Sequence, residues 1–111
     1  MENFLDAYPI RECEYEMNEN LVTVLYKKKK LTFIERTFFK KVSSKPHKID
    51  LDEIGSFIWH LCDGENSIDS IITIARDHFG EKIEPAEERT VKFIEQMNKS
   101  KLVNLYKKRT K

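Results

Sequence analysis

The residue types that most often catalyse reactions or bind metals are few in this sequence, and they lie far apart. Its three histidines, His47, His60 and His78, have neither the HxH nor the HxxxH spacing of metal sites. The acidic pairs Asp52-Glu53 and Glu87-Glu88 stand where helices are expected to begin, and the helix dipole favours carboxylates there without any acid–base chemistry. We therefore expect no catalytic residues, no metal site, no cofactor and no enzymatic activity.

Composition argues against several further classes of binding site and cellular location. With three glycines, the chain has neither a GxGxxG motif nor a Walker loop to hold a phosphate. Its two cysteines, Cys13 and Cys62, lack the CxxC spacing, so we expect two free thiols. A formal net charge of +1 argues against binding polyanions by overall charge. No apolar run is as long as a membrane span and no signal-peptide pattern opens the chain, so we expect a cytoplasmic protein.

The stretch from Ile49 to Gly64 predicts a strand end, a helix and a helix stop in direct succession. Ile49 and Leu51 alternate with charged residues, as in a half-buried strand. Asp50 and Glu53 have the spacing of a capping box, which places a helix start here. One face of that helix is continuously apolar, with residues Leu51, Ile54, Phe57, Ile58 and Leu61.

Two further helices follow. Ser67 is suited to cap the first of them, and Gly80 to end it. Its expected buried residues are Ile68, Ile71, Ile72, Ala75 and Phe79. Pro85 fits the first position of the last helix, where a missing N–H costs nothing. The apolar face of that helix is predicted to contain Val91, Ile94 and Met97, with Phe93 beside it.

Strands are expected on both sides of these helices. Residues 21–26 are rich in β-branched and aromatic side chains, with apolar residues on both faces, so we predict a strand that is covered on both sides. Pro46 cannot donate a ladder hydrogen bond, so the strand from Pro46 to Leu51 should start at a sheet edge. Residues 102–106 predict a short final strand. The sequence thus indicates an α+β, winged-helix-like fold, with a small antiparallel sheet of two to three strands followed by three helices.

The remaining segments are less regular. Residues 1–20 are interpreted as a loosely packed lead-in before a domain spanning residues 21–106, and residues 107–111 as a basic tail. Within the lead-in, a short turn or strand around Ile10 to Tyr15 is the expected local structure, and a docking arm is the alternative to a loose tail. The four lysines Lys27 to Lys30 are interpreted as a solvated turn, with an anion-binding patch or a contact for an acidic peptide as the alternatives. The segment from Leu31 to Lys41 fits a strand and a helix equally well, and it could also contact a partner enzyme or a membrane surface.

The central stretch also resembles the signature of the PqqD family, the pyrroloquinoline quinone biosynthesis protein D family. The matching parts are Leu51-Asp52, Gly55 to Trp59, Asp63-Gly64 and Ser67-Ile68, and the resemblance runs from about Leu21 to Leu102-Val103. Asp52 departs from the Asn that is common at this position in the family, but both residues can cap a helix. The resemblance implies a domain, also called the precursor-peptide recognition element, that binds the leader of a ribosomally made precursor peptide. It then presents that peptide to a modifying enzyme, often a radical S-adenosylmethionine enzyme.

A peptide could bind such a domain at an open strand edge, whose unpaired N–H and C=O groups can pair with another strand. The resemblance implies which edge is used: the strand before the first helix, beside a groove bordered by the third helix. Carried over by position, the strand residues are Lys48, Ile49, Asp50 and Leu51, and the helix residues are Arg89, Lys92, Phe93 and Gln96. In this hypothesis Arg89 and Lys92 pair with acidic leader residues while Phe93 forms an apolar floor. Alternatively, both cations are merely solvated and Phe93 belongs to the core.

Two other functions fit the predicted fold. A winged-helix nucleic-acid binder should present several basic or amide side chains on one helix, but the second helix offers only Arg76 and the third mixes basic with acidic residues. We therefore expect no nucleic-acid partner. A structural subunit of a larger enzyme would share the fold and lack the groove. An open strand edge could also pair with a second copy of the chain, so a homodimer is possible.

Overall fold

The computed structural model describes residues 4–26 and 47–107 of the chain. Its α+β fold, with small antiparallel sheets and three α-helices among these residues, confirms the predicted class. Residues 27–30 and 31–41, whose conformation the sequence left open, lie outside the described residues, as does the tail beyond residue 107. The elements in chain order are η1 (Phe4–Asp6), β1 (Tyr8–Arg11), β2 (Glu14–Asn18), β3 (Leu21–Tyr26), β4 (His47–Asp50), α2 (Glu53–Leu61), α3 (Ile68–Phe79), η2 (Gly80–Ile83), α4 (Ala86–Lys99) and β5 (Val103–Tyr106).

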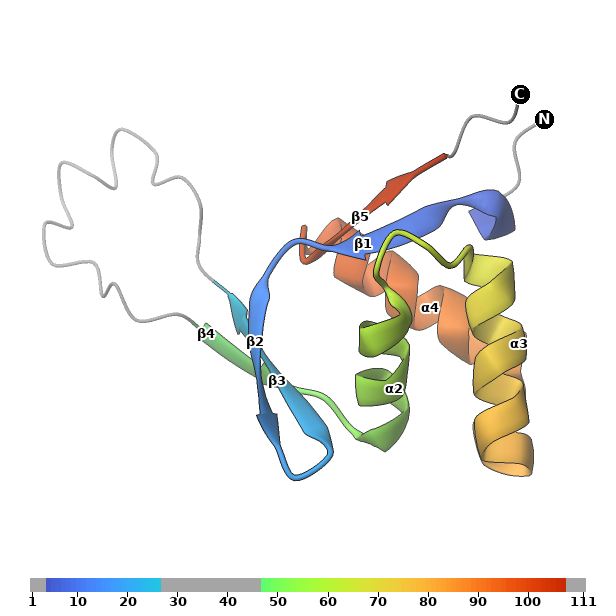
Figure 1. Cartoon of the computed structure of the whole chain (residues 1–111), viewed down its shortest axis with the longest axis horizontal. Helices are drawn as coiled ribbons and strands as arrows, with labels where there is room; N and C mark the ends of the chain where they lie inside the picture. The colour runs from blue at the N-terminus through green and yellow to red at the C-terminus, as the bar shows by residue number, and fades with distance from the viewer. Residues whose placement is uncertain (1–3, 27–46, 108–111) are drawn as a thin grey trace, which may run out of the picture.

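The strands form two separate sheets. β2, β3 and β4 make an antiparallel sheet with β3 in the middle, and β1 pairs antiparallel with β5 (Figure 1). In β3, Val22 and Val24 are fully buried, whereas Leu21 is 43% exposed. The expectation that this strand is covered on both sides is therefore wrong. α2 contacts β3, and the alternate residues of β3 on the other face remain at least partly accessible.

The interpretation of the first twenty residues as a loosely packed lead-in is wrong for residues 4–20. β1 joins the last strand, β5, and β2 forms a hairpin with β3. Ala7 and Pro9 are buried, and Phe4 and Leu5 pack against the core. Much of the order in this segment comes from pairing with the far end of the chain, which leaves little trace in a local residue pattern. The two ends of the described chain therefore lie on the same side of the molecule (Figure 1).

The helices begin and end largely where the sequence places them. The Ser67 side chain accepts a hydrogen bond from the Ser70 N–H at 3.1 Å, which caps α3, and Gly80 ends that helix with a φ of 60°. Gly64 has a φ of 81° just after α2. Pro85 is the N-cap of α4, whereas the sequence predicted it at the first helical position, so the helix begins one residue later than expected.

The predicted capping box at the start of α2 is wrong. Asp52, not Asp50, is the N-cap, and its carboxylate accepts from the Gly55 N–H at 2.7 Å. Asp50 lies in β4 and accepts from the Thr23 hydroxyl at 2.8 Å. The Leu51 N–H still donates to the Val22 carbonyl at 2.9 Å, so strand pairing continues through Leu51 and the helix can begin only after it.

The core lies between the sheets and the helices. On α2 the buried residues are Gly55, Ser56, Ile58 and Trp59. The predicted apolar face is thus rotated: Ile58 is buried, but Phe57 and Leu61 are only partly so. The Ser56 hydroxyl accepts from the Val22 N–H at 2.8 Å, which joins α2 to β3. On α3 the expected Ile68, Ile71, Ile72 and Ala75 are buried, whereas Phe79, which was also expected to be, is only partly so. On α4 the buried residues are Ala86, Thr90 and Ile94, while Val91 and Met97 of the predicted apolar face are only partly buried.

Candidate functional site

β4 is an edge strand among the described residues, because it pairs only with β3. In an antiparallel pair, opposite residues alternate between hydrogen-bonded and non-bonded positions. The bond from the Leu51 N–H to the Val22 carbonyl fixes this alternation, so Ile49 is bonded to its partner Val24. The main-chain N–H and C=O groups of Lys48 and Asp50 therefore point away from β3. They are the groups with which an added strand would pair.

A groove of about 280 Å³ lies between α2 and α4, at the end of the connection from β4. The four residues of α4 that were predicted to bind peptide all line it. The complete lining is Asp52, Ile54, Gly55, Ile58, Arg89, Lys92, Phe93 and Gln96. Two aliphatic side chains and one aromatic ring thus stand beside three charged groups, which suits a peptide that carries both apolar and charged residues.

Gly55 lies at a close approach between α2 and α4. A Cβ atom at this position would lie 3.1 Å from Cε1 of Phe93 and 3.1 Å from Oδ1 of Asp52. A side chain on Gly55 would push either the ring of Phe93 or the carboxylate that caps α2. Phe93 is partly buried against the core, so it serves both as a wall of the core and as an apolar surface of the groove.

The charged side chains of the groove differ in their surroundings. Arg89 and Lys92 lie on the exposed side of α4. The Arg89 guanidinium donates to the Lys82 carbonyl at 3.4 Å, a long and therefore weak hydrogen bond. On the α2 side, the Asp52 carboxylate already accepts from the Gly55 N–H. The cations of the groove thus come from α4, and the one acidic group in the lining caps a helix.

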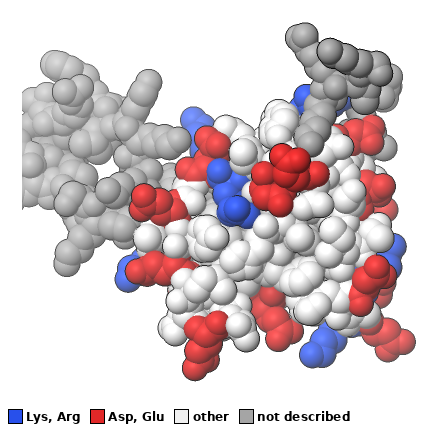
Figure 2. Space-filling model, in the orientation of Figure 1, with Lys and Arg blue, Asp and Glu red and all other residues white. Residues whose placement is uncertain are grey.

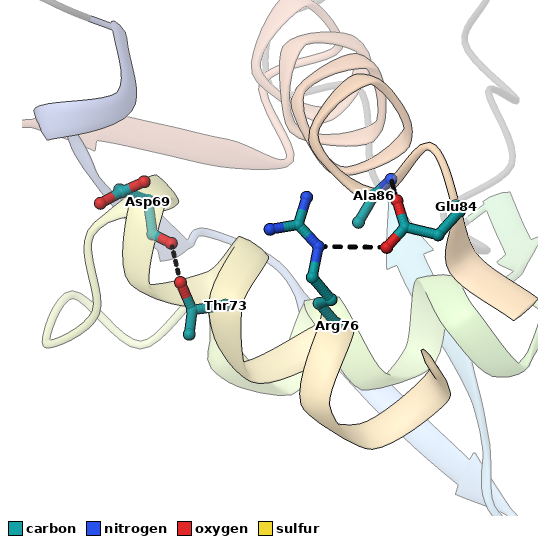
Figure 3. A network of polar contacts seen from close by, with 5 residues as sticks. All are labelled: Asp69, Thr73, Arg76, Glu84 and Ala86. Carbon is teal, nitrogen blue, oxygen red and sulfur yellow. Dashed lines mark hydrogen bonds and ion pairs between the residues drawn. The ribbon is translucent and has the colours of Figure 1, made fainter. Parts of the chain in front are cut away.

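The start of α4 is fixed by a small polar network (Figure 3). The Arg76 Nε donates to one oxygen of Glu84 at 3.1 Å, and the other oxygen accepts from the Ala86 N–H at 3.0 Å. The bond from Ala86, together with the charge of Arg76, holds the pKa of Glu84 below its usual value of 4.5. On α3, the Thr73 hydroxyl donates to the Asp69 carbonyl at 3.3 Å. The two bonds of Glu84 connect α3 to the first turn of the helix that carries the groove wall, whereas the Thr73 bond lies within α3.

The structure separates the predicted site residues into two groups. Arg89, Lys92, Phe93 and Gln96 line the groove, whereas Lys48, Ile49 and Asp50 lie on the neighbouring strand and are not part of its lining. Leu51 is 8% exposed, so it belongs to the core, and it is not part of the lining either. The residues of α2 in the lining were not predicted as site residues. The sequence feature that could have revealed them is the pair Ile54 and Ile58, four residues apart, with Gly55 between them.

Metal binding and thiol chemistry can be checked in the described part of the chain. No cluster of three or more His, Cys, Asp or Glu residues there could hold a metal ion. Burial raises the pKa of the Cys62 thiol to about 12, so it stays protonated and unreactive at neutral pH. No helix within residues 4–26 and 47–107 has the length and apolarity that a membrane crossing requires.

Comparison with known proteins connects this geometry to a family. The family model for coenzyme PQQ synthesis protein D (PqqD) matches residues 42–103. The chain belongs to the PqqD family. The matched span contains β4 and the three helices, and therefore every residue of the groove. Members of this family are accessory, non-catalytic proteins of PQQ biosynthesis. No curated protein and no solved structure matched the chain.

Proposed function

We propose that this chain is a non-catalytic peptide-binding module. It recognises the leader of a ribosomally synthesised precursor peptide and presents that peptide to a modifying enzyme, such as a radical S-adenosylmethionine enzyme. The observation that carries the proposal is the open edge of β4 followed directly by the groove between α2 and α4. Membership of the PqqD family supports it, because accessory proteins act on other molecules of a pathway without catalysing a step.

The first contact in this proposal is strand addition. The outward N–H and C=O groups of Lys48 and Asp50 would pair with the backbone of the leader, independently of its sequence. Each such hydrogen bond contributes about 0.5–1.5 kcal/mol after the exchange with water. Backbone pairing at this short edge therefore gives modest affinity, and the side chains must supply the rest.

The second contact is in the groove. Side chains of an added strand alternate, so every second one can face α4. An apolar residue would pack on Phe93, Ile54 and Ile58. Acidic residues would lie near Arg89 and Lys92, where opposite charges add specificity and faster association. The preferred leader would therefore carry acidic residues close to an aliphatic or aromatic one.

Binding of nucleic acid, the alternative function, finds no support here. On the face that Figure 2 shows, acidic side chains are spread among the neutral ones, and the described basic side chains form no continuous stripe. Phosphate backbones bind through rows of Lys and Arg, and neighbouring carboxylates oppose that binding.

A pull-down experiment tests the proposal. The tagged protein and its Lys48→Pro variant would capture partners side by side from nuclease-treated native lysate, followed by mass spectrometry. We expect the original chain to retain a short precursor peptide, with or without its modifying enzyme, and the folded variant to lose the peptide. Recovery of neither, together with DNA retained in an untreated sample, would reject peptide binding in favour of nucleic-acid binding.

A further inference from the structure

The three-stranded sheet has a second open edge. β2 pairs only with β3 among the described residues, as β4 does on the other side. Val22 directs its main-chain groups toward β4, since its carbonyl accepts from Leu51. The residues of β3 that bond to β2 are therefore its odd-numbered ones, which leaves Tyr15 and Met17 with outward-pointing main-chain groups. This edge offers an extended peptide the same kind of backbone partners as β4.

The charged side chains on one face of this second edge are nevertheless all acidic, whereas on the other face the Arg11 guanidinium lies 5.7 Å from the centre of the Tyr15 ring. Residues 12–20 contain Glu12, Glu14, Glu16 and Glu19 and no basic residue. Glu14 and Glu16 are exposed and lie on the face of β2 opposite Tyr15, which packs edge-on against Trp59. A strand added beside β2 would have its own side chains next to these glutamates, at the short distances of cross-strand neighbours.

The groove beside β4 has the opposite charge on its α4 wall, where Arg89 and Lys92 stand. β4 itself carries the exposed Lys48 and Asp50, and Asp52 also lines the groove. The two edges thus offer similar backbone partners and different electrostatics: the charged side chains of β2 are all acidic, whereas β4 and its groove carry both signs. Like charges on neighbouring strands disfavour pairing and opposite charges favour it, so an acidic peptide would distinguish the edges by charge.

We propose that Glu14 and Glu16 are specificity-determining residues that keep an acidic leader off the β2 edge and so direct it to the β4 edge. This inference rests on the proposed function, because it presupposes an acidic peptide that binds by strand addition. It assigns a role in binding to residues outside the groove and outside the span that the family model matches.

The test uses amide NMR spectra of the full chain, titrated with a capped synthetic peptide that alternates valine with glutamate. In the original chain, we expect shifts at Lys48, Asp50 and the groove residues of α4, and none at Tyr15 or Met17. In the double variant Glu14→Lys/Glu16→Lys, we expect a second set of saturable shifts at Tyr15 and Met17. The stoichiometry should then rise from one peptide per chain to two.

Two matched samples make the result decisive. Asp77→Lys/Glu81→Lys changes the net charge by the same amount at exposed positions on α3 and η2, and it should leave one peptide per chain. Glu14→Gln/Glu16→Gln removes the repulsion without adding attraction, and it should give a weaker second site. If the lysine double variant is folded and still binds one peptide at β4, or if the original chain already binds at both edges, the inference is wrong while the proposed function stands. Absence of shifts at β4 and α4 in every sample would instead reject the proposed function.

Discussion

β1 and β4 are both four-residue strands, but they use their hydrogen-bonding groups differently. β1 is bonded along both edges: β5 pairs with one, and the turn after α2 bonds to the other, through Arg11 N–H to the Cys62 carbonyl and Gly64 N–H to the Pro9 carbonyl, each 2.9 Å. β4 is bonded only to β3 among the described strands. A strand with both edges occupied can only support the fold, whereas a strand with one open edge can still bind. Substitutions around β1 should thus lower stability, and substitutions on the outer edge of β4 should lower affinity.

The largest effect is expected from Gly64→Ala, on the β1 side. Gly64 has a φ of 81°, and a Cβ atom there would lie 2.8 Å from the Tyr106 hydroxyl, which donates to the Gly64 carbonyl at 2.6 Å. Backbone strain together with the weakened hydrogen bond should lower the free energy of unfolding by about 2–4 kcal/mol, measured by urea denaturation.

Gly80→Ala is the matched control for this substitution. Gly80 has a φ of 60°, but a Cβ atom there would meet nothing within 4 Å. Only the strain of this backbone conformation, with φ 60° and ψ −132°, remains, so the loss should be smaller, about 1–3 kcal/mol. Equal losses at the two glycines would show that the contact with Tyr106 is unimportant and that the turn does not hold β1 in the way we describe.

Lys48→Pro should have the next largest effect, and it should act on binding. Proline removes the outward N–H of an exposed edge residue and leaves the leader carbonyl opposite it without a donor. The cost of that unpaired carbonyl, about 1–3 kcal/mol, should lower the affinity for a leader peptide by about fivefold to a hundredfold, as measured by calorimetry. The free energy of unfolding should change little, because this N–H does not bond to β3. Ile49→Pro is the contrasting variant: its N–H points to Val24, so unfolding should become easier. If Lys48→Pro unfolds the chain as readily as Ile49→Pro, the assigned strand alternation is wrong.

The difference between β1 and β4 also explains how much of the fold the sequence could predict. The ends of α3 were predicted because Ser67 and Gly80 act within one turn of their own positions. For β1 the sequence indicated only a short turn or strand around Ile10 to Tyr15, and its bounds and partner were missed because Tyr8 pairs with Tyr106, from the opposite end of the chain. A pattern read over a short window contains no information about such a distant partner, and the glutamates and proline of this region have low strand propensity.

The candidate site was predictable only in part, for a related reason. Arg89, Lys92, Phe93 and Gln96 were named from a family resemblance, and they do share one side of α4. The contribution of α2 was missed because it depends on how that helix is rotated. Strand pairing through Leu51 delays the helix start to Asp52, and the buried face shifts toward Trp59. Ile54 and Gly55 then face the groove, which periodicity alone could not specify.

Arg89→Glu tests whether the groove beside β4 binds peptide, and its expected effect on affinity is smaller than that of Lys48→Pro. Reversing one exposed charge should weaken binding of an acidic peptide by about threefold to tenfold and leave a peptide with glutamine in place of glutamate unaffected. Lys99→Glu makes the same change on α4 outside the groove lining and should affect neither peptide. Equal weakening by both variants would mean that the overall charge of the protein matters, and that Arg89 is not a contact.

The smallest expected effect is a change in the pKa of His60, near the C-terminal end of α2. There β1 contributes the Arg11 side chain as well as its backbone. The Arg11 guanidinium donates to the Trp59 and His60 carbonyls at 3.0 and 2.9 Å. Partial burial, and secondly the charge of Arg11, lower the pKa of His60 from its ordinary value of 6.5. Arg11→Gln should therefore raise this pKa part of the way back, as followed by NMR titration of the imidazole, while Arg76→Gln should leave it unchanged.

The lowered pKa of His60 also determines in which direction stability changes with pH. The folded chain favours neutral His60, so as the pH falls below 6.5 the unfolded chain gains its proton first and the folded state loses stability. This loss should be smaller in Arg11→Gln than in the original chain, since the lowered pKa is then partly relieved. An unchanged His60 pKa in that variant would mean that solvent screens the guanidinium charge. Arg11 would then join β1 to α2 through its hydrogen bonds to the helix carbonyls and not through its charge.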